Sequence, residues 1–254
     1  MAAFTIGADP ELFFRNNYKL VSVIDKLGGS KEEPLPLDIP GCAIQEDNVA
    51  AEFNIPPCND VEAFKFHINY VLGELRKRAE AMGLSLAPNV ASHSFDDEEL
   101  NHWKARMFGC DPDYNAWTKK KNPPPYAEDE NLRSAGGHVH IGARLDPFDL
   151  GRACDLFLGV PSTRLDPDTT RRNLYGRAGS IRPKPYGMEY RTLSNFWIWS
   201  EEHTEWVYDQ TQKAVRFVEE GHKIPNLIGA HIRKAINEGD VQAYERSMKF
   251  ASGF

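Results

Sequence analysis

Polar side chains at alternate positions inside apolar, strand-like segments are the feature that most constrains how this chain can fold. Three segments have the pattern: GADPELFF with Asp9 and Glu11, GGHVHIGA with His138 and His140, and GMEYRTL with Glu189 and Arg191. Side chains two positions apart in a strand point to the same face of a sheet. Each strand therefore presents charge or imidazole on a face that would normally carry Val, Ile or Phe.

A fourth segment adds a carboxylate pair in a hairpin. Two strands are predicted in residues 42–55, CAIQEDNVAAEFNI, around a tight turn near Asn48. Glu46 or Asp47 then faces Glu52 across the turn, and the sequence leaves both alternatives open. A single polar strand face would indicate only exposure to solvent. Four such faces together predict that they line one concave surface.

Five carboxylates would converge on that surface. Each like-charge contact at about 4 Å costs roughly 4 kcal/mol at an effective dielectric constant near 20. This repulsion requires cations. Hard oxygen ligands favour Mg²⁺, with Mn²⁺ as the alternative where a histidine joins the ligands. The sequence therefore predicts a divalent metal centre.

Arginines lie close to these segments in the sequence, at Arg177, Arg182 and Arg191. Arginine binds phosphate and carboxylate groups through two parallel hydrogen bonds. Divalent metals and arginines in one cleft indicate a nucleoside triphosphate that undergoes phosphoryl transfer. The chain has no Walker A motif, no GxGxxG and no protein-kinase signature, so the common ATP-binding folds are not supported.

The order of the predicted elements favours an α+β fold. The clearest helix runs from Asn59 to Met82, with Asn59 and Glu62 as a capping box. Further strands, hairpins and helices are expected at 3–8, 136–143, 173–197, 200–220 and 226–248, and a helix begins at Asp146–Pro147. Strands followed by helices, without a regular βαβ alternation, predict an antiparallel sheet.

Residues 111–131 are predicted to form a long loop that contains KKK, PPP and EDE runs. Loops this long in compact domains are typical of lids, and a lid is expected over 115–131. The neighbouring CDPDYN motif contains Asp111 and Asp113 and is predicted to form a turn.

Composition limits the class of partner. Lys plus Arg total 30 and Asp plus Glu total 37, which gives a net charge of -7, so bulk nucleic-acid binding is not expected. No stretch approaches the roughly 18 apolar residues of a membrane span, and the start lacks the basic region of a secretory signal. The four cysteines form no CxxC pair, which favours free thiols in a reducing cytoplasm. A single catalytic domain is expected over 1–254, with a helical C-terminal part at 200–254.

The four polar segments resemble the glutamine synthetase superfamily, in the order in which that superfamily carries them. GADPELFF resembles its strand with two acidic metal ligands, QEDNVAAEFNI its acidic hairpin, GGHVHIG its Gly-x-His-x-His strand, and GRAGSIRPKPYGMEYRTL its late Arg, Ile-Arg and Glu-x-Arg segment. Four sequence segments resemble those of the COOH–NH2 amidoligases of tailed phages and some bacteria: GADPELF, DNVAAEFNIPP, GCDPDYNAW and LRSAGGHVHIG. These amidoligases are small relatives of glutamine synthetase and glutamate–cysteine ligase. The resemblance covers about residues 4–197.

This resemblance implies a curved antiparallel sheet with helices on its outer face and the cleft on its inner face. It implies ATP as the cosubstrate and two groups of metal ligands: Glu11, Glu52 and Asp47 or Glu46 near the carboxylate substrate, and Asp9, His138 and Glu189 at the ATP phosphates. His140 would contact phosphate, Arg177 and Arg182 would bind the transferring and β-phosphates, and Arg191 would bind the substrate or the acyl-phosphate. A structural ion pair with Glu189 is the alternative for Arg191.

The sequence departs from the superfamily in two respects. Asp9 stands where glutamine synthetase has Glu, which makes this ligand one methylene shorter. The chain also has no room for the small N-terminal domain that completes the shared active site of the ring-shaped synthetase. Neither that ring nor ammonia specificity is therefore expected, and the oligomeric state is open.

The function that we predict is an ATP-dependent carboxylate–amine ligase of the cytoplasm, or of the host cytoplasm if the chain is phage-encoded. ATP would phosphorylate a small-molecule or peptide carboxylate, and an amine would attack the acyl-phosphate. The alternatives are a guanidino-type phosphotransferase on a similar sheet and a non-catalytic Mg-ATP-binding protein. Glu11→Gln or Glu189→Gln is expected to abolish activity and to leave the fold intact or slightly more stable.

Overall fold

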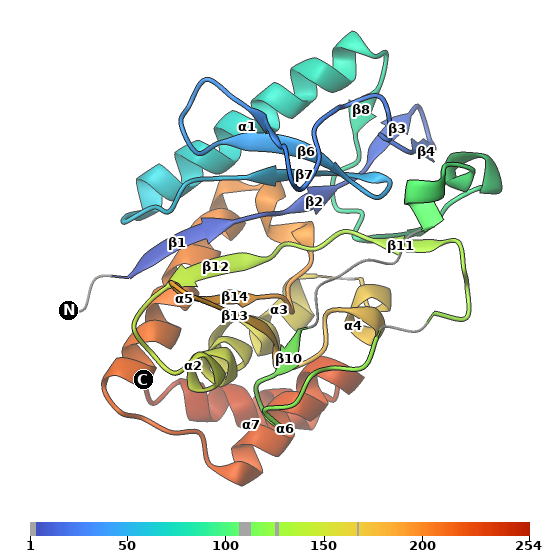
Figure 1. Ribbon diagram of the computed structural model, residues 1–254. Coiled ribbons are helices and arrows are strands. Elements are labelled where there is room, and N and C mark those ends of the chain that lie inside the picture. The colour runs from blue at the N-terminus through green and yellow to red at the C-terminus, as the bar shows by residue number, and fades with distance from the viewer. Residues whose placement is uncertain (1–3, 107–112, 125–126, 167) are drawn as a thin grey trace.

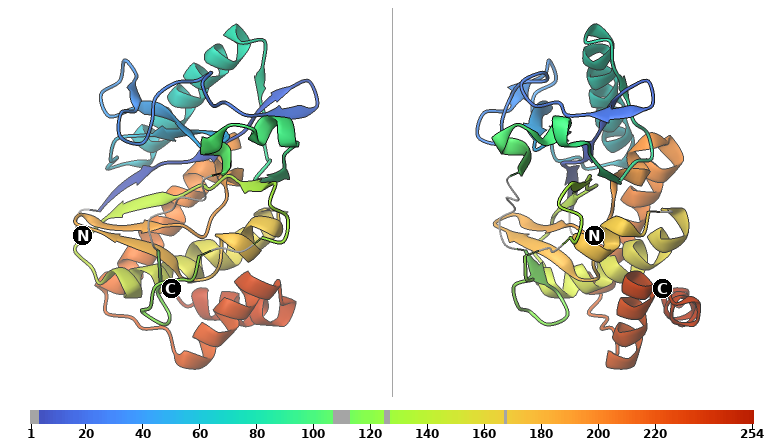
Figure 2. Two further views of the ribbon diagram at one scale, coloured as in Figure 1. Left: turned by 45° about the vertical axis from the view of Figure 1, so that its right-hand side comes forward. Right: turned by 90° about the vertical axis from the view of Figure 1, so that its right-hand side faces the viewer.

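The structure, a computed structural model, describes residues 4–106, 113–124, 127–166 and 168–254. Its strands pair in antiparallel sheets, and most of the helices lie on one side of these sheets (Figures 1 and 2). This arrangement confirms the predicted α+β class. None of the helices in the described parts is long and apolar enough to cross a membrane.

Two sheets form the centre of the molecule. The larger has the order β1 (Thr5–Ala8), β12 (Val139–Gly142), β14 (Gly187–Tyr190), β13 (Ser180–Lys184) and β10 (Tyr114–Asn115). The other has the order β2 (Glu11–Leu12), β7 (Ala50–Asn54), β6 (Ala43–Asp47) and β5 (Leu35–Pro36). Two small sheets flank them: β4 (Lys19–Val21) with β3 (Phe14–Asn16) and β8 (Ser85–Leu86), and β11 (Leu132–Ser134) with β9 (Ser92–Ser94).

The N-terminal segment joins the two central sheets. β1 pairs with β12 on one side, while Ile6 exchanges backbone hydrogen bonds with Cys58 on the other. Further along, Phe53 N donates to Pro10 O at 3.1 Å, and Glu11 N donates to Gly136 O at 2.8 Å. The bend between β1 and β2 therefore lies between the acidic hairpin and the GGHVH strand, which brings three of the polar segments together.

The longest helix, α1 (Val61–Ala81), packs behind the hairpin of β6 and β7 (Figure 1). Its inward stripe is apolar at helical spacing, and Phe64 stacks on Trp197 with ring centroids 5.7 Å apart. The predicted capping box at Asn59 is wrong. Asp60 caps the helix instead, because its backbone is extended and its carboxylate accepts a hydrogen bond from Ala63 N at 2.8 Å.

The residues that the structure describes form these further helical segments: α2 (Pro147–Cys154), a π-helical turn (Asp155–Gly159), α3 (Val160–Leu165), α4 (Thr170–Leu174), α5 (Glu201–Glu219), α6 (Asn226–Glu238) and α7 (Val241–Ala251). Short 3₁₀ turns lie at Asp97–Leu100, Trp103–Arg106 and Asn195–Trp199. Asp146 caps α2, as predicted. The continuous helix predicted over 226–248 is wrong, because Gly239 takes a left-handed φ of 68° and separates α6 from α7.

The segment predicted as a loop and lid is anchored at its beginning. Tyr114–Asn115 pairs with β13 as the edge strand β10. Trp117 Nε1 donates a hydrogen bond to Asp155 Oδ2 at 2.6 Å. The Trp117 ring packs against Gly229, and a Cβ atom at position 229 would lie only 2.5 Å from the ring. Residues 115–117, the first part of the predicted lid, are therefore anchored to the sheet and the helices.

Candidate active site

One row of side chains crosses the five-stranded sheet. Arg182 on β13 lies opposite Glu189 on β14, Glu189 lies opposite His140 on β12, and His140 lies opposite Gly7 on β1. Directly opposed residues in antiparallel strands project to the same face. The row therefore carries alternating charge on a face that is not covered by helices.

The first cluster of possible metal ligands stands on this row. Asp9, His140 and Glu189 each place a ligand atom within 4.8 Å of the others. His140 Nε2 lies 3.1 Å from Asp9 Oδ2, and His138 Nδ1 lies 3.4 Å from Asp9 Oδ1. Asp9 Oδ1 and His140 Nε2 are buried, and their close contacts do not have the geometry of a hydrogen bond among the described residues. A carboxylate and imidazoles gathered in this way fit the ligands of a divalent cation.

The second cluster consists of Glu11, Asp47 and Glu52, whose ligand atoms also lie within 4.8 Å of one another. Glu11 on β2 is directly opposite Glu52 on β7. Glu11 Oε2 accepts a hydrogen bond from Gly136 N at 2.7 Å. Burial and the neighbouring Asp47 raise the pKa of Glu11 to about 7, and burial with repulsion from Asp9, Asp47 and Glu11 raises the pKa of Glu52 well above its usual range. Three carboxyl groups this close together repel one another when all are ionised. A bound cation would relieve that repulsion in place of the protons that the raised pKa values favour.

The structure distinguishes between the two hairpin candidates. Glu46 Oε1 accepts a hydrogen bond from Gly28 N at 2.8 Å, on the opposite face of the strand from the cluster. Asp47 shares a hydrogen bond with Glu52. Asp47 is therefore the hairpin residue that the structure brings to the cluster, and Asp9 and Glu11, although only two residues apart, belong to different clusters.

Glu189 is completely buried and surrounded by cations. Arg182 Nη1 and Lys184 Nζ lie 3.1 and 3.2 Å from Glu189 Oε2, and Arg191 Nη1 contacts Glu189 Oε1. Burial and Asp9 raise the pKa of this carboxyl, but Arg191, His138 and Arg182 outweigh them and lower it. The structural ion pair considered for Arg191 is thus present. The expectation that Glu189→Gln leaves the fold unharmed loses its basis, because the substitution removes a counterion and not a repelling charge.

His138 and Arg177 differ in their relation to the first cluster. His138 is buried, 3.8 Å from Glu189 Oε1 through Nδ1, and burial with the nearby Arg191 lowers its pKa to about 4. It can therefore remain neutral as a ligand. The Arg177 side chain is exposed, and no contact to either cluster occurs within the described ranges. The Arg177 carbonyl only accepts a hydrogen bond from Thr192 Oγ1 at 3.0 Å.

Three residues near the clusters were missed by the sequence reasoning: Arg171, Lys184 and Tyr186. Arg171 is 2% exposed, donates to Thr192 O and Arg191 O at 3.0 and 3.1 Å, and lies 3.3 Å from His138 Nε2. Lys184 has the same alternate spacing from Arg182 that marked the other strands, so its position could have been inferred. For Arg171, in a short helix, no such signal exists.

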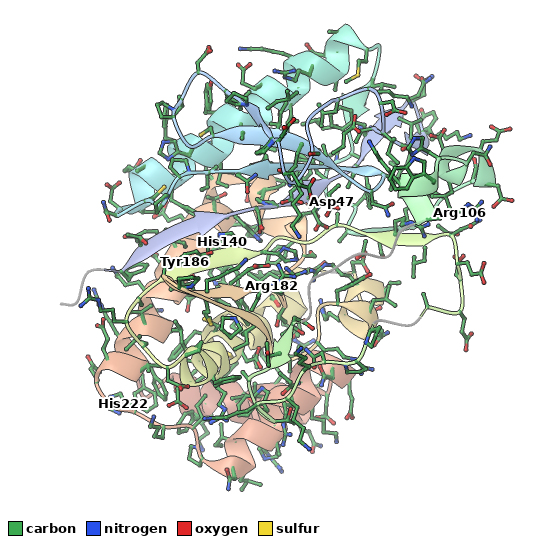
Figure 3. All side chains as sticks on the ribbon, viewed as in Figure 1. Asp47, Arg106, His140, Arg182, Tyr186 and His222 are labelled. Carbon is green, nitrogen blue, oxygen red and sulfur yellow. The ribbon has the colours of Figure 1, made fainter. Side chains whose placement is uncertain are left out.

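Tyr186 connects the first cluster to a pocket. Its hydroxyl lies 3.1 Å from His140 Nδ1, and the two rings stack with centroids 6.0 Å apart. A histidine that ligates a metal through one nitrogen usually holds its other nitrogen in such a hydrogen bond. Beside Tyr186 is a cavity of about 720 Å³, lined also by Thr5, Gly142, Leu145 and Glu219. Figure 3 shows His140 and Tyr186 next to each other, with Arg182 below and Asp47 above them.

Part of the chain matches a known protein family. Residues 131–251 match the family model of the phage phiEco32-like COOH–NH2 ligases, type 2. The match confirms the resemblance to phage-type amidoligases and supports a carboxylate–amine ligase. It includes His138, His140, Glu189 and Arg191, whereas the carboxylates from Asp9 to Glu52 precede it. No curated protein matches the chain.

The acidic cluster should make the metal-free protein less stable as the pH rises. The folded-state pKa values of Glu11, Asp47 and Glu52 are raised, so their stabilising contribution is complete below the unfolded value near 4.5 and is lost as the pH rises through the folded values, about 7 for Glu11. In EDTA we expect the melting temperature to fall between pH 5 and 7.5 by on the order of 5 °C. Mg²⁺ should raise it more at pH 7.5 than at pH 5.5. An Mg²⁺ effect that is equal at both pH values would contradict the expectation.

Proposed function

We propose that this protein is an ATP-dependent carboxylate–amine ligase that forms an amide through an acyl-phosphate. The observation that carries the proposal is the pair of adjacent ligand clusters, one beside cations and a pocket and the other made only of carboxyl groups. We further propose that the joined sheets correspond to the catalytic sheet of glutamine synthetase, within a single catalytic domain. The match to the COOH–NH2 ligase family supports the reaction type.

The two clusters suit different substrates. The Asp9, His140 and Glu189 cluster adjoins Arg182, Lys184 and the pocket beside Tyr186, which suits the triphosphate and nucleoside of ATP. The stacked Tyr186 ring provides an aromatic surface for the base. The Glu11, Asp47 and Glu52 cluster would hold its metal toward the carboxylate substrate.

The residues of the chain would act on the reaction in two steps. In the first step a carboxylate oxygen would attack the γ-phosphorus of ATP and ADP would leave, and Arg182 and Arg191, which contact Glu189, would stabilise the negative charge that develops. Mg²⁺ ions bound by the two clusters would neutralise the phosphate and carboxylate charges. In the second step an amine attacks the carbonyl carbon and phosphate leaves. Phosphorylation is needed because the oxide of a free carboxylate is a poor leaving group.

A hydroxamate assay tests this function. Purified protein, Mg²⁺ and ATP are incubated with pools of amino acids, dicarboxylic acids and peptides in the presence of hydroxylamine, which captures an acyl-phosphate as a hydroxamate. We expect ADP and hydroxamate in equal amounts with at least one pool, and no sustained ADP release when the acid is omitted.

The same assay separates the rival functions. A guanidino-type phosphotransferase would release ADP with a nitrogen acceptor and give no hydroxamate. A non-catalytic Mg-ATP-binding protein would gain thermal stability with Mg²⁺ and ATP but release no ADP with any pool. Either outcome from a folded protein would overturn the proposed ligase.

A further inference from the structure

One further carboxylate, that of Asp113, lies outside both metal clusters, next to the row formed by Arg182, Glu189 and His140. Tyr114 pairs with Ile181 and Asn115 pairs with Ser180, so the next position of the register places Asp113 opposite Arg182. Ile181 is completely buried against the helix layer, beside the position of Gly151. Arg182 therefore projects to the opposite face, and Asp113, the residue directly before β10, continues the register next to it, with Arg182 and Arg191 as its charged neighbours.

The position of Asp113 is fixed by two hydrogen bonds to Asn122. Its carbonyl accepts a hydrogen bond from Asn122 N at 2.9 Å, and its carboxylate accepts one from the Asn122 side chain. The carboxylate is half-buried. Burial raises its pKa, and the nearby Arg191 and Arg182 only partly offset this effect. The CDPDYN motif was predicted to form a turn; in the structure Asp113 directly precedes the edge strand β10, near Arg182 and Arg191, and Asp111 lies outside the described residues.

The second step of the proposed reaction needs a proton acceptor. An alkylamine is protonated at neutral pH, since its pKa is close to that of a lysine side chain, about 10.4. The protonated nitrogen has no lone pair and cannot attack a carbonyl carbon. The carboxyl groups of the two clusters are committed to metals under the proposed function, and Glu189 is enclosed by three cations.

We infer that Asp113 binds the protonated amine substrate at the edge of the sheet and accepts its proton. The proton moves from R–NH3⁺ to the Asp113 carboxylate, the free lone pair attacks the carbonyl carbon of the acyl-phosphate, and the C–O bond to phosphate breaks with its electron pair on the phosphate. The second nitrogen proton leaves with the phosphate, which gives a neutral amide. This assignment rests on the proposed ligase function and adds the class of the second substrate, a cationic primary amine that enters beside β10.

Hydroxylamine provides the discriminating comparison, because it is mostly unprotonated at neutral pH and needs no base to become a nucleophile. Wild type, Asp113→Asn and Asp113→Glu are assayed with the best acid from the hydroxamate screen and with either hydroxylamine or a panel of ammonium, methylamine, glycine and lysine. Glu128→Gln serves as the matched control, since it removes an exposed carboxylate from the same segment of the chain.

In Asp113→Asn we expect amide formation with the protonated amines to fall by at least about 100-fold. Hydroxamate formation should stay within about threefold of wild type, and Asp113→Glu should recover part of the amide activity. Glu128→Gln should change neither rate.

Three results would overturn the assignment of Asp113. One is an equal loss of hydroxamate and amide in both Asp113 variants, which indicates a role in positioning Arg182 alone. The second is unchanged amide formation in Asp113→Asn, and the third is a wild type that forms hydroxamate but no amide from any amine in the panel. Failure of the ligase function itself would look different, because wild type would then form no hydroxamate.

Discussion

Glu189→Gln is expected to destabilise the metal-free protein by about 3 kcal/mol, because it leaves buried cations without their counterion. Glu189 is completely buried, and Arg182, Lys184 and Arg191 all contact its carboxylate. Glu52→Gln is expected to have the opposite effect and to raise the unfolding free energy by about 1 kcal/mol. Glu52 is held among Glu11 and Asp47, and a glutamine amide can still donate a hydrogen bond to Asp47.

Both substitutions should nevertheless reduce hydroxamate formation by at least about 100-fold, since each removes a negative ligand of the reaction centre. Urea unfolding at pH 7.5 in EDTA measures the stability change, and the hydroxamate assay measures the activity. Glu46→Gln is the matched control: it keeps an acceptor for Gly28 N, lies next to Asp47 and faces away from the cluster. Changes of the same sign in the Glu189 and Glu52 variants would show that the two clusters are not electrostatically distinct.

Much of the architecture followed from local pattern. Alternation of side chains predicted the strands that carry His140 and Glu189, whereas Asp9 and His138 lie just outside the strands β1 and β12. The hairpin of β6 and β7 also followed from the turn at Asn48, whose φ of 53° is of the kind that asparagine tolerates. These features depend on residues that are close in sequence.

Features that depend on register could not be predicted in the same way. Glu46 and Asp47 are adjacent, so only the pairing of Gln45 with Glu52 shows which of them shares the face of Glu52. Arg182 and Lys184 lie on the strand opposite Glu189, whereas Arg191 follows Glu189 by two residues. An alternating charge pattern is the same in sequence on an exposed strand face as in a cleft. The edge strand that follows Asp113 was not predicted, because β10 pairs with β13 across a long separation in sequence.

The anchored loop shows a different limit of the sequence. Residues 114–121 are polar and basic except for Tyr114, Ala116 and Trp117, so no periodicity marks them as structured. Trp117 is held by its hydrogen bond to the buried carboxylate of Asp155 and by packing of its ring against Gly229, which has no side chain. Both partners lie in distant helices, and neither residue type would by itself have suggested the contact.

Arg191→Lys is expected to reduce turnover by at least about 100-fold although a lysine can still form an ion pair with Glu189. The Arg191 backbone is fixed on both sides, since its N donates to Ser180 O at 2.9 Å and its carbonyl accepts from Arg171 at 3.1 Å. One guanidinium nitrogen contacts Glu189. A planar fork can keep that contact and also present donors to an acyl-phosphate, whereas an ammonium acts as a single point charge.

The measurement separates the two roles considered for Arg191. If it serves only as the ion-pair partner of Glu189, Arg191→Lys should keep near-normal turnover at a small cost in stability. If it also binds the reacting group, kcat should fall while the melting temperature changes little. Arg152→Lys is the matched control: Arg152 pairs with Asp149 at 3.3 Å and donates to Ala116 O on the helix side, so its loss should lower stability and leave kcat unchanged. A kcat near the wild-type value in Arg191→Lys would reduce Arg191 to a structural residue and leave Arg182 and Lys184 as the cations that act on the phosphoryl group.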